Sequence, residues 1–198
     1  AMLGEAGWKD SNGDGWLDLL HSENGGAVVS VDAGAGRSLG PPLTVTPTGV
    51  ADLALVEGLL AVLLPAPAGF LLVVDPASGE QVVAIGDPGT PSFVRLESAG
   101  GSDLLAVDAG SGLDPFSEPG RAVLLSRQPP SWVPGAVVEF PGAFLNDAAA
   151  ADLDGDGNLD IVGALFSRGG PGVAIAWGTP QGFAAPVLVP APEESPWV

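Results

Sequence analysis

Four short apolar segments recur along the chain at similar intervals, and this repetition limits the folds open to it. They begin 42, 45 and 55 residues apart and read LDLL (17–20), LLAV (59–62), LLAV (104–107) and LDIV (159–162). Each lies among three further apolar runs bounded by Gly or Pro, so each interval holds four short strands. Repeats of roughly 40–50 residues with four strands are typical of propeller blades. We therefore predict an all-β chain, a β-propeller built of four-stranded antiparallel blades, with four blades in this chain.

The predicted blades fill the chain as a single domain, residues 1–198. We expect their boundaries near 1–47, 48–89, 90–142 and 143–192, with a C-terminal tail at 192–198. Three assemblies fit four blades: a piece of a longer propeller, a small closed ring, or half of an eight-bladed ring that a homodimer completes. Open ends would expose blade faces and strand edges, which favours the two closed assemblies. A β-sandwich or a solenoid with coincidental spacing is the rival fold.

Two segments test the strand prediction. The most apolar region, residues 50–74, contains Asp52, Glu57 and two prolines, so we predict buried strands there instead of a membrane-spanning helix. The run Ala148–Ala151 suits a helical turn by alanine's propensity. The innermost strand of a blade is crowded and favours small residues, so a strand is the preferred prediction for this run as well.

Composition supports a turn-rich β protein with a real core. The chain has 30 Gly and 20 Pro, which break helix interiors, and 46% hydrophobic residues, which separate it from disordered chains. It has no Cys, which excludes disulfides and thiolate chemistry. The formal net charge is −18 with only six Lys and Arg. Nucleic acid is therefore excluded as a partner, and neither membrane insertion nor binding to anionic lipid is expected.

Two acidic loops are the most specific chemical feature of the sequence. They read DSNGDGWLD (10–18) and DLDGDGNLD (152–160), and both fit the pattern D-x-[DN]-G-D-G-x-L-D. Alternate side chains of a tight loop can turn inward, and glycine permits the positive φ that wrapping requires. Ca²⁺ takes about six to eight oxygen ligands, including backbone carbonyls. We predict two Ca²⁺ sites, the second tighter, with the ligands Asp10, Asn12, Asp14, Trp16 (carbonyl) and Asp18, and Asp152, Asp154, Asp156, Asn158 (carbonyl) and Asp160.

Three rivals compete with this prediction. An EF-hand needs Glu at loop position 12 and flanking helices, whereas position 12 is His21 or Gly163 and the flanks are strand-like. Mg²⁺ prefers to keep its waters and takes fewer protein ligands. A metal-free Asp-Gly hairpin would leave several carboxylates crowded with no Lys or Arg inside either loop.

The segments WKDSNGDGWLDLL and ADLDGDGNLDIVGA resemble the calcium loops of FG-GAP or VCBS-type repeats, which are found in integrin α chains and many secreted bacterial proteins. The resemblance implies a propeller in which the loop joins the first two strands of a blade and binds Ca²⁺ through the ten residues named above. The second blade, at LVEGLLAV, lacks the loop. The third, at LESAGGSDLLAV, keeps Glu97 and Asp103 at a shorter spacing, so no metal is assigned there.

The remaining polar residues suggest no catalytic site, and we expect that the protein is not an enzyme. His21 is the only histidine, and no phosphate-binding glycine loop is present. We expect a recognition or scaffold module at an extracellular or cell-surface location, although residues 1–10 do not resemble a signal peptide. Its ligand would be a protein or a glycan, with Trp16 as the best candidate for sugar stacking. The alternatives are an enzyme for carbohydrate or ester substrates and a ligand-free structural repeat.

Overall fold

The computed structural model is built of short antiparallel strands. It describes residues 7–9, 18–23, 28–32, 34–35, 38–39, 43–46, 52–64, 70–75, 81–86, 93–109, 119–129 and 131–189, with side chains in 52–64, 71–75, 95–109, 119–129 and 131–189. Every regular element in these ranges is a strand. None of them contains a helix with the length and apolar character needed to cross a membrane.

The strands form four four-stranded sheets, each from one contiguous part of the chain. Sheet 1 contains β1 (Gly7–Lys9), β2 (Asp18–Glu23), β3 (Val28–Asp32) and β6 (Leu43–Thr46). Sheet 2 contains β7 (Asp52–Val56), β8 (Leu59–Leu63), β9 (Phe70–Val74) and β10 (Gln81–Gly86). Sheet 3 contains β11 (Phe93–Ser98), β12 (Leu104–Asp108), β13 (Gly120–Gln128) and β14 (Ser131–Phe140). Sheet 4 contains β15 (Ala143–Ala151), β16 (Asp160–Ser167), β17 (Gly170–Ala176) and β20 (Val187–Val189).

Neighbouring strands within each sheet are antiparallel and lie in chain order. Two short ribbons project from the sheets: β4 (Gly34–Ala35) with β5 (Ser38–Leu39), and β18 (Gly178–Thr179) with β19 (Gly182–Phe183). The prediction of an all-β chain with antiparallel four-stranded sheets is confirmed. The region 50–74 supplies β7, β8 and β9, and the alanine run lies in β15, so both segments form strands as predicted.

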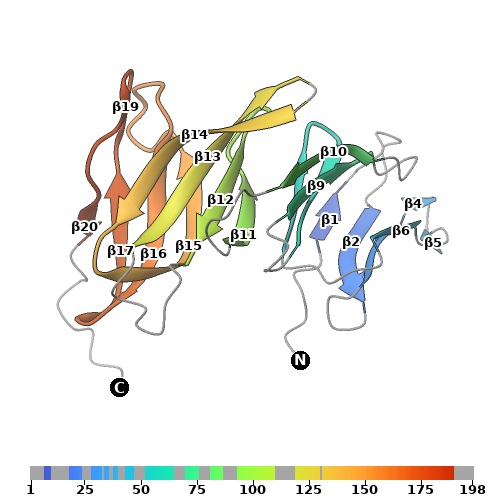
Figure 1. Ribbon diagram of the computed structural model, residues 1–198, viewed down its shortest axis with the longest axis horizontal. Helices are drawn as coiled ribbons and strands as arrows, with labels where there is room; N and C mark the ends of the chain where they lie inside the picture. Colours follow the sequence, from blue (N-terminus) through green and yellow to red (C-terminus); the bar gives the residue numbers. More distant parts are fainter. Residues whose placement is uncertain are drawn as a thin grey trace.

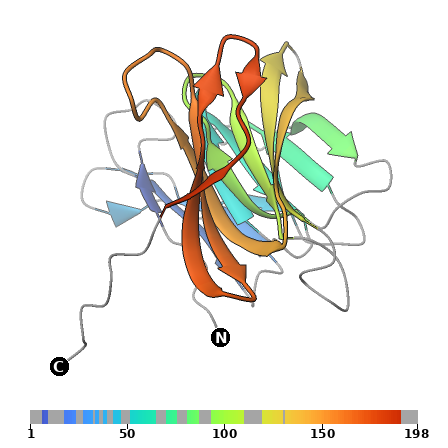
Figure 2. The same cartoon turned by 90° about the vertical axis from the view of Figure 1, so that its left-hand side faces the viewer.

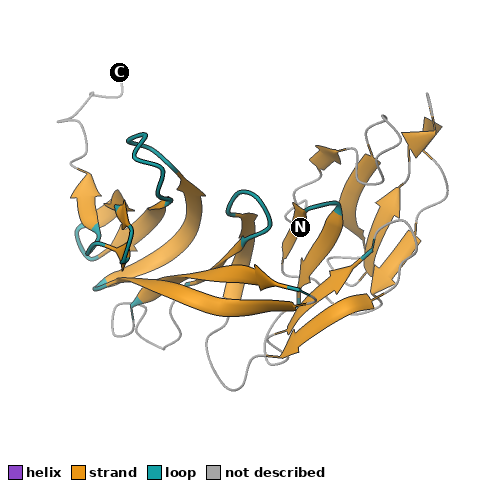
Figure 3. Cartoon of the chain, turned by 90° about the horizontal axis from the view of Figure 1, so that it is seen from above, coloured by secondary structure: helices purple, strands orange, loops and turns teal. Residues whose placement is uncertain are grey.

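The four sheets stand in chain order along the molecule, from sheet 1 at the blue end to sheet 4 at the red end (Figure 1). Seen from above, they make an open row (Figure 3). A ring closed by the four sheets of one chain, one of the three predicted assemblies, is not seen in this arrangement. Contacts between sheets 2 and 3 join their first strands, β7 and β11, whereas β15, the first strand of sheet 4, contacts β11, β12 and β13 of sheet 3.

Sheet 3 is apolar on both faces because it lies between two other sheets. Along β12, Leu104 and Ala106 belong to the core shared with sheet 2, whereas Leu105 and Val107 belong to the core shared with sheet 4. All four side chains are at most 1% exposed. Alternate residues of a strand point to opposite faces, so a strand buried on both sides reads as a continuous apolar run. This explains why LLAV shows no polar alternation.

Sheet 2 follows the same rule, and sheet 4 does not. In sheet 2, Ala61 faces sheet 3, while Leu60 and Val62 form a separate buried cluster on the opposite face. In sheet 4, Ile161 packs in the core against sheet 3, but Val173 on the other face is 41% exposed. Sheet 4 therefore has one buried face and one face open to solvent.

Truncating the core between sheets 3 and 4 should destabilise the protein strongly. Leu105 is fully buried there, so Leu105→Ala should lower the free energy of unfolding by about 2–5 kcal/mol. Urea denaturation followed by tryptophan fluorescence measures this change. The matched control is Val137→Ala on β14, where the side chain is 50% exposed and the loss should stay within about 0.5 kcal/mol. Equal losses in the two variants would contradict the assigned core.

Candidate metal centre

The second acidic loop lies between the first two strands of sheet 4. Ala151 pairs with Asp160 at the end of the β15–β16 ladder, which leaves residues 152–159 as the loop. In sheet 1, Lys9 pairs with Asp18 at the end of the β1–β2 ladder, which leaves residues 10–17 between the strands. The two acidic segments therefore join corresponding strands and have equal lengths.

The corresponding connections of sheets 2 and 3 are shorter. In sheet 2, Glu57 and Gly58 form a two-residue turn with φ of 49° and 75°, and Val56 pairs directly with Leu59. In sheet 3, Ser98 pairs with Leu104, so that only residues 99–103 lie between the strands. The absence of a metal loop predicted at LVEGLLAV agrees with this two-residue turn.

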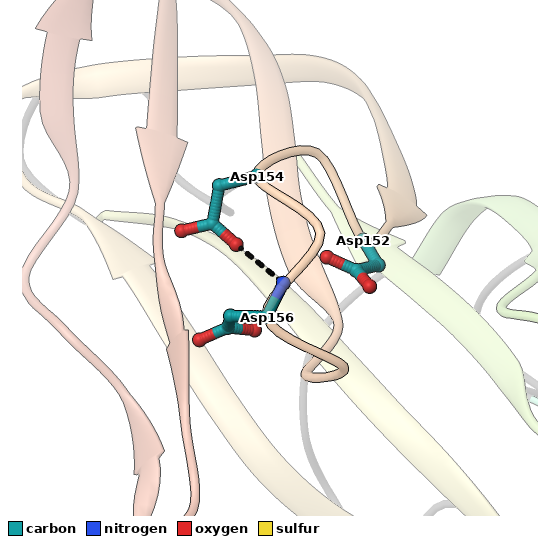
Figure 4. Close-up of side chains that lie close together, drawn as sticks. All are labelled: Asp152, Asp154 and Asp156. Carbon is teal, nitrogen blue, oxygen red and sulfur yellow. Dashed lines mark hydrogen bonds between the residues drawn. The ribbon is translucent and has the colours of Figure 1, made fainter.

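Three of the predicted ligands come together in sheet 4. One carboxylate oxygen from each of Asp152, Asp154 and Asp156 lies within 4.8 Å of the others, and all three residues are exposed. The three side chains project from alternate positions of one tight loop (Figure 4). Among the described side chains, this is the one group of at least three His, Cys, Asp or Glu arranged in this way.

Hydrogen bonds within the loop hold these carboxylates in place. Asp152 accepts the N–H groups of Gly155 at 2.8 Å and Gly157 at 3.0 Å, one on each oxygen. Asp154 Oδ1 accepts the N–H of Asp156 at 3.1 Å, as Figure 4 shows. Gly155 and Gly157 have φ of 79° and 88°, the left-handed region that side chains other than glycine rarely adopt. The two glycines of the D-G-D-G motif are therefore required by the turn.

Asn158 adjusts the electrostatics of the loop. Its backbone N–H and its side-chain Nδ2 each donate to Asp156, both at 2.8 Å. The backbone hydrogen bond first, and the side-chain hydrogen bond next, lower the pKa of Asp156 below its ordinary value. Asp156 is therefore ionised at neutral pH and available as a ligand. Three carboxylate donors at this separation suit a hard divalent cation, which prefers oxygen ligands.

Asp160, the fourth predicted carboxylate ligand, has a different environment. It is 1% exposed, and its two oxygens accept the N–H of Leu153 at 2.8 Å and the N–H of Gly178 at 2.7 Å. It does not belong to the cluster of three exposed aspartates. Asp160 therefore connects the start of the loop to the segment that follows β17.

Asp103 makes a corresponding hydrogen bond to the backbone in sheet 3. Its Oδ1 accepts the N–H of Arg127 at 2.8 Å. Asp103 and Asp160 occupy equivalent positions. Leu104, the residue after Asp103, pairs with Leu125, and the donor Arg127 lies two residues beyond Leu125. Likewise Ile161, the residue after Asp160, pairs with Ala176, and the donor Gly178 lies two residues beyond Ala176. The acid at the start of the second strand therefore accepts one backbone N–H at, or just beyond, the end of the third strand in both sheets.

Sheet 2 has no acid at this position. Leu59 precedes Leu60, which pairs with Val74, and two residues beyond Val74 the sequence has Pro76. Proline has no N–H, so this position of sheet 2 has no donor that would need a carboxylate as its acceptor. This correspondence indicates that the acid at the start of the second strand has a structural role.

Sequence reasoning missed Gly178. A Cβ at this position would collide with the carbonyl oxygen of Leu159, so only glycine allows its N–H to approach Asp160. The signal that could have found it is a glycine at the equivalent position of sheet 1. There Asp32 pairs with Leu19, the residue after Asp18, and Gly34 follows Asp32 by two positions, as Gly178 follows Ala176.

The other predicted ligands belong to the first acidic segment, residues 10–18. Asp10, Asn12, Asp14 and Trp16 lie outside the described residues, as does the proposed role of Trp16 in sugar stacking. Asp18 is the first residue of β2. Of the other tryptophans, Trp132 is 1% exposed in the core between sheets 2 and 3, where its Nε1 donates to the Ser102 carbonyl at 2.7 Å. It is therefore a packing residue.

Removing the Asp160 carboxylate should destabilise the metal-free protein. Asp160→Ala leaves the N–H groups of Leu153 and Gly178 without their acceptor, at a cost of about 1–3 kcal/mol for each group that stays buried. Urea denaturation in EDTA measures the loss. The control is Asp154→Ala, which removes an exposed carboxylate and should change the stability by about 0.5 kcal/mol or less. If the two variants are equally stable, Asp160 does not have the structural role assigned to it.

Comparison with known proteins identifies no family for this chain. No protein-family model matches the sequence, and no curated protein matches it.

Proposed function

We propose that this protein is a calcium-binding recognition or scaffold module in which Ca²⁺ is structural. The observation that carries the proposal is the convergence of Asp152, Asp154 and Asp156, whose carboxylate oxygens lie within 4.8 Å of one another. Like charges at this distance repel, and a divalent cation converts the repulsion into attraction. The bound ion would hold the β15–β16 connection in one conformation.

The chemistry of the loop favours Ca²⁺ over Mg²⁺. Ca²⁺ accepts six to eight oxygen ligands in irregular geometry, whereas Mg²⁺ requires a near-ideal octahedron and retains several waters. An exposed loop with three carboxylates, joined on this proposal by the Asn158 carbonyl and by water, supplies the larger and less regular set. Extracellular calcium modules bind at about 10⁻⁴–10⁻³ M. We propose that the protein acts outside the cell, and we therefore expect its Ca²⁺ affinity to lie in this range.

The proposal includes a propeller-type arrangement of blades. Three features support it: each sheet has four strands in chain order, the first strands β7, β11 and β15 mediate contacts between sheets, and the acidic loops connect first to second strands. The last feature is the position that the resemblance to FG-GAP or VCBS-type repeats implies for a calcium loop. On this proposal the loop ends of the blades present a surface for a protein or glycan ligand, and the protein has no catalytic role.

Calcium should bind and stabilise the protein. We expect two Ca²⁺ per chain, seen as mass increments in native mass spectrometry. The melting temperature should rise with added Ca²⁺, since a ligand at 100 times its Kd stabilises the folded state by about 2.7 kcal/mol. Mg²⁺ at equal concentration should stabilise the protein less. If millimolar Ca²⁺ leaves both the mass and the melting temperature unchanged, the proposed function is wrong.

A double variant tests whether the acidic loop of sheet 4 is one of the two Ca²⁺ sites. The double substitution Asp154→Asn with Asp156→Asn removes two charges but keeps oxygen acceptors for the loop hydrogen bonds. It should lower the Ca²⁺ count from two to one, with the remaining ion in residues 10–18. The control Asp147→Asn changes an exposed acid of β15 outside the cluster and should retain both ions. Retention of two ions by the double variant would exclude this loop as a site.

A further inference from the structure

The acidic loop of sheet 4 contains two aspartates that are each followed by a glycine. The two dipeptides are Asp154–Gly155 and Asp156–Gly157, and all four residues are exposed. In Figure 2 sheet 4 stands in front of the other sheets, and the loop between β15 and β16 projects beyond the ends of these strands. An aspartate before glycine can react with its own backbone, because glycine has no side chain to shield its nitrogen. The loop therefore presents two candidate modification sites to solvent.

This reaction needs no reagent other than water. The backbone nitrogen of the glycine attacks the side-chain carboxyl carbon of the aspartate, and a C–N bond forms. One carboxyl oxygen leaves as water with the proton of the N–H and a proton from solvent, which closes a cyclic imide. Water then adds to either carbonyl of the imide. Addition at the side-chain carbonyl restores aspartate, whereas addition at the main-chain carbonyl gives isoaspartate, whose backbone contains an extra carbon.

The two attacking nitrogens have closely matched surroundings. The N–H of Gly155 donates to Asp152 Oδ1 at 2.8 Å, and the N–H of Gly157 donates to Asp152 Oδ2 at 3.0 Å. Each N–H therefore points at a carboxylate oxygen that can accept its proton as the C–N bond forms. The two glycines also have similar φ values, 79° and 88°. Any difference in reactivity between the dipeptides must therefore come from the carboxyl groups that are attacked.

The loop holds these two carboxyl groups unequally. Asp156 Oδ1 accepts the backbone N–H of Asn158, and Asp156 Oδ2 accepts the side-chain Nδ2 of the same residue, both at 2.8 Å. Loss of an oxygen from Asp156 therefore requires one of these two hydrogen bonds to break, and hydrogen bonds to an ionised group are among the stronger ones. Asp154 accepts one backbone N–H, that of Asp156, at the longer distance of 3.1 Å. Asp154 is therefore the less restrained of the two.

We propose that Asp154 is a site of spontaneous isomerisation to isoaspartate in the folded protein, and that Asn158 protects Asp156 from the same reaction. The product has a longer backbone between residues 154 and 155, and its free carboxylate is attached directly to the α-carbon. The arrangement of three exposed aspartates is then lost, so the reaction sets a chemical lifetime for this cluster. The proposal rests on the hydrogen bonds of the loop and is independent of calcium binding.

The test compares the folded chain with the chain unfolded in guanidinium chloride, both aged in EDTA at the same pH and temperature. Trypsin then releases residues 128–168, because Arg127 and Arg168 bound this segment. Electron-transfer fragmentation locates isoaspartate, since it breaks the extra carbon–carbon bond of the backbone. In the folded chain, isoaspartate at position 154 should exceed that at 156 by about fivefold or more, the factor that one hydrogen bond of ordinary net strength gives. In the unfolded chain the two amounts should be similar.

A variant tests the protection of Asp156. Asn158→Ala removes the side-chain donor and keeps the backbone N–H, so it should raise isoaspartate at position 156 in the folded protein and leave position 154 unchanged. The matched control is Leu153→Ala, which shortens an exposed side chain of the same loop and should change neither position. A folded wild-type chain without isoaspartate at 154, equal amounts at 154 and 156, or no rise at 156 in Asn158→Ala would each overturn the proposal.

Discussion

The packing of one sheet against the next is the interaction on which the rest of this structure depends. A sheet within the row has to be apolar on both faces, which forces strands such as β12 to read as unbroken apolar runs. Close approach of the sheets also limits side-chain size. A Cβ on Gly163 would lie 2.8 Å from Phe140 of sheet 3, so glycine at this point allows sheet 4 to approach its neighbour.

The carboxylates of the acidic loop have two different roles. Asp152, Asp154 and Asp156 are exposed and cluster where a cation can reach them, whereas Asp160 is buried and satisfies two backbone N–H groups. Because Asp103 makes an equivalent hydrogen bond in sheet 3, beside a short turn without the D-G-D-G motif, this structural role does not require the acidic loop. The same short segment therefore has two separate roles: Asp160 stabilises the sheet, and the three exposed aspartates form the cluster that a cation can reach.

Much of the fold could be read from the sequence because its local signals agree. Apolar runs of strand length, bounded by Gly and Pro, predicted the strands of sheets 2 to 4, and even the alanine run in β15 follows from its place in the pattern. The D-G-D-G motif likewise predicted the convergence of three aspartates, because the positive φ of Gly155 and Gly157 is a local property. The environment of Asp160 could not be predicted in this way, since its donor at Gly178 lies beyond two further strands.

The sequence by itself determined the strands, the antiparallel pairing and the turn that gathers the loop carboxylates, because each depends on residues close together in the chain. Only the tertiary structure decided which apolar faces are covered. Val162 and Leu105 are similar residues at equivalent strand positions, yet Leu105 is buried by sheet 4 and Val162 lies on a face that no described sheet covers. Burial depends on which sheet packs against a given face. This arrangement involves several sheets and cannot be read from the residues of a single strand.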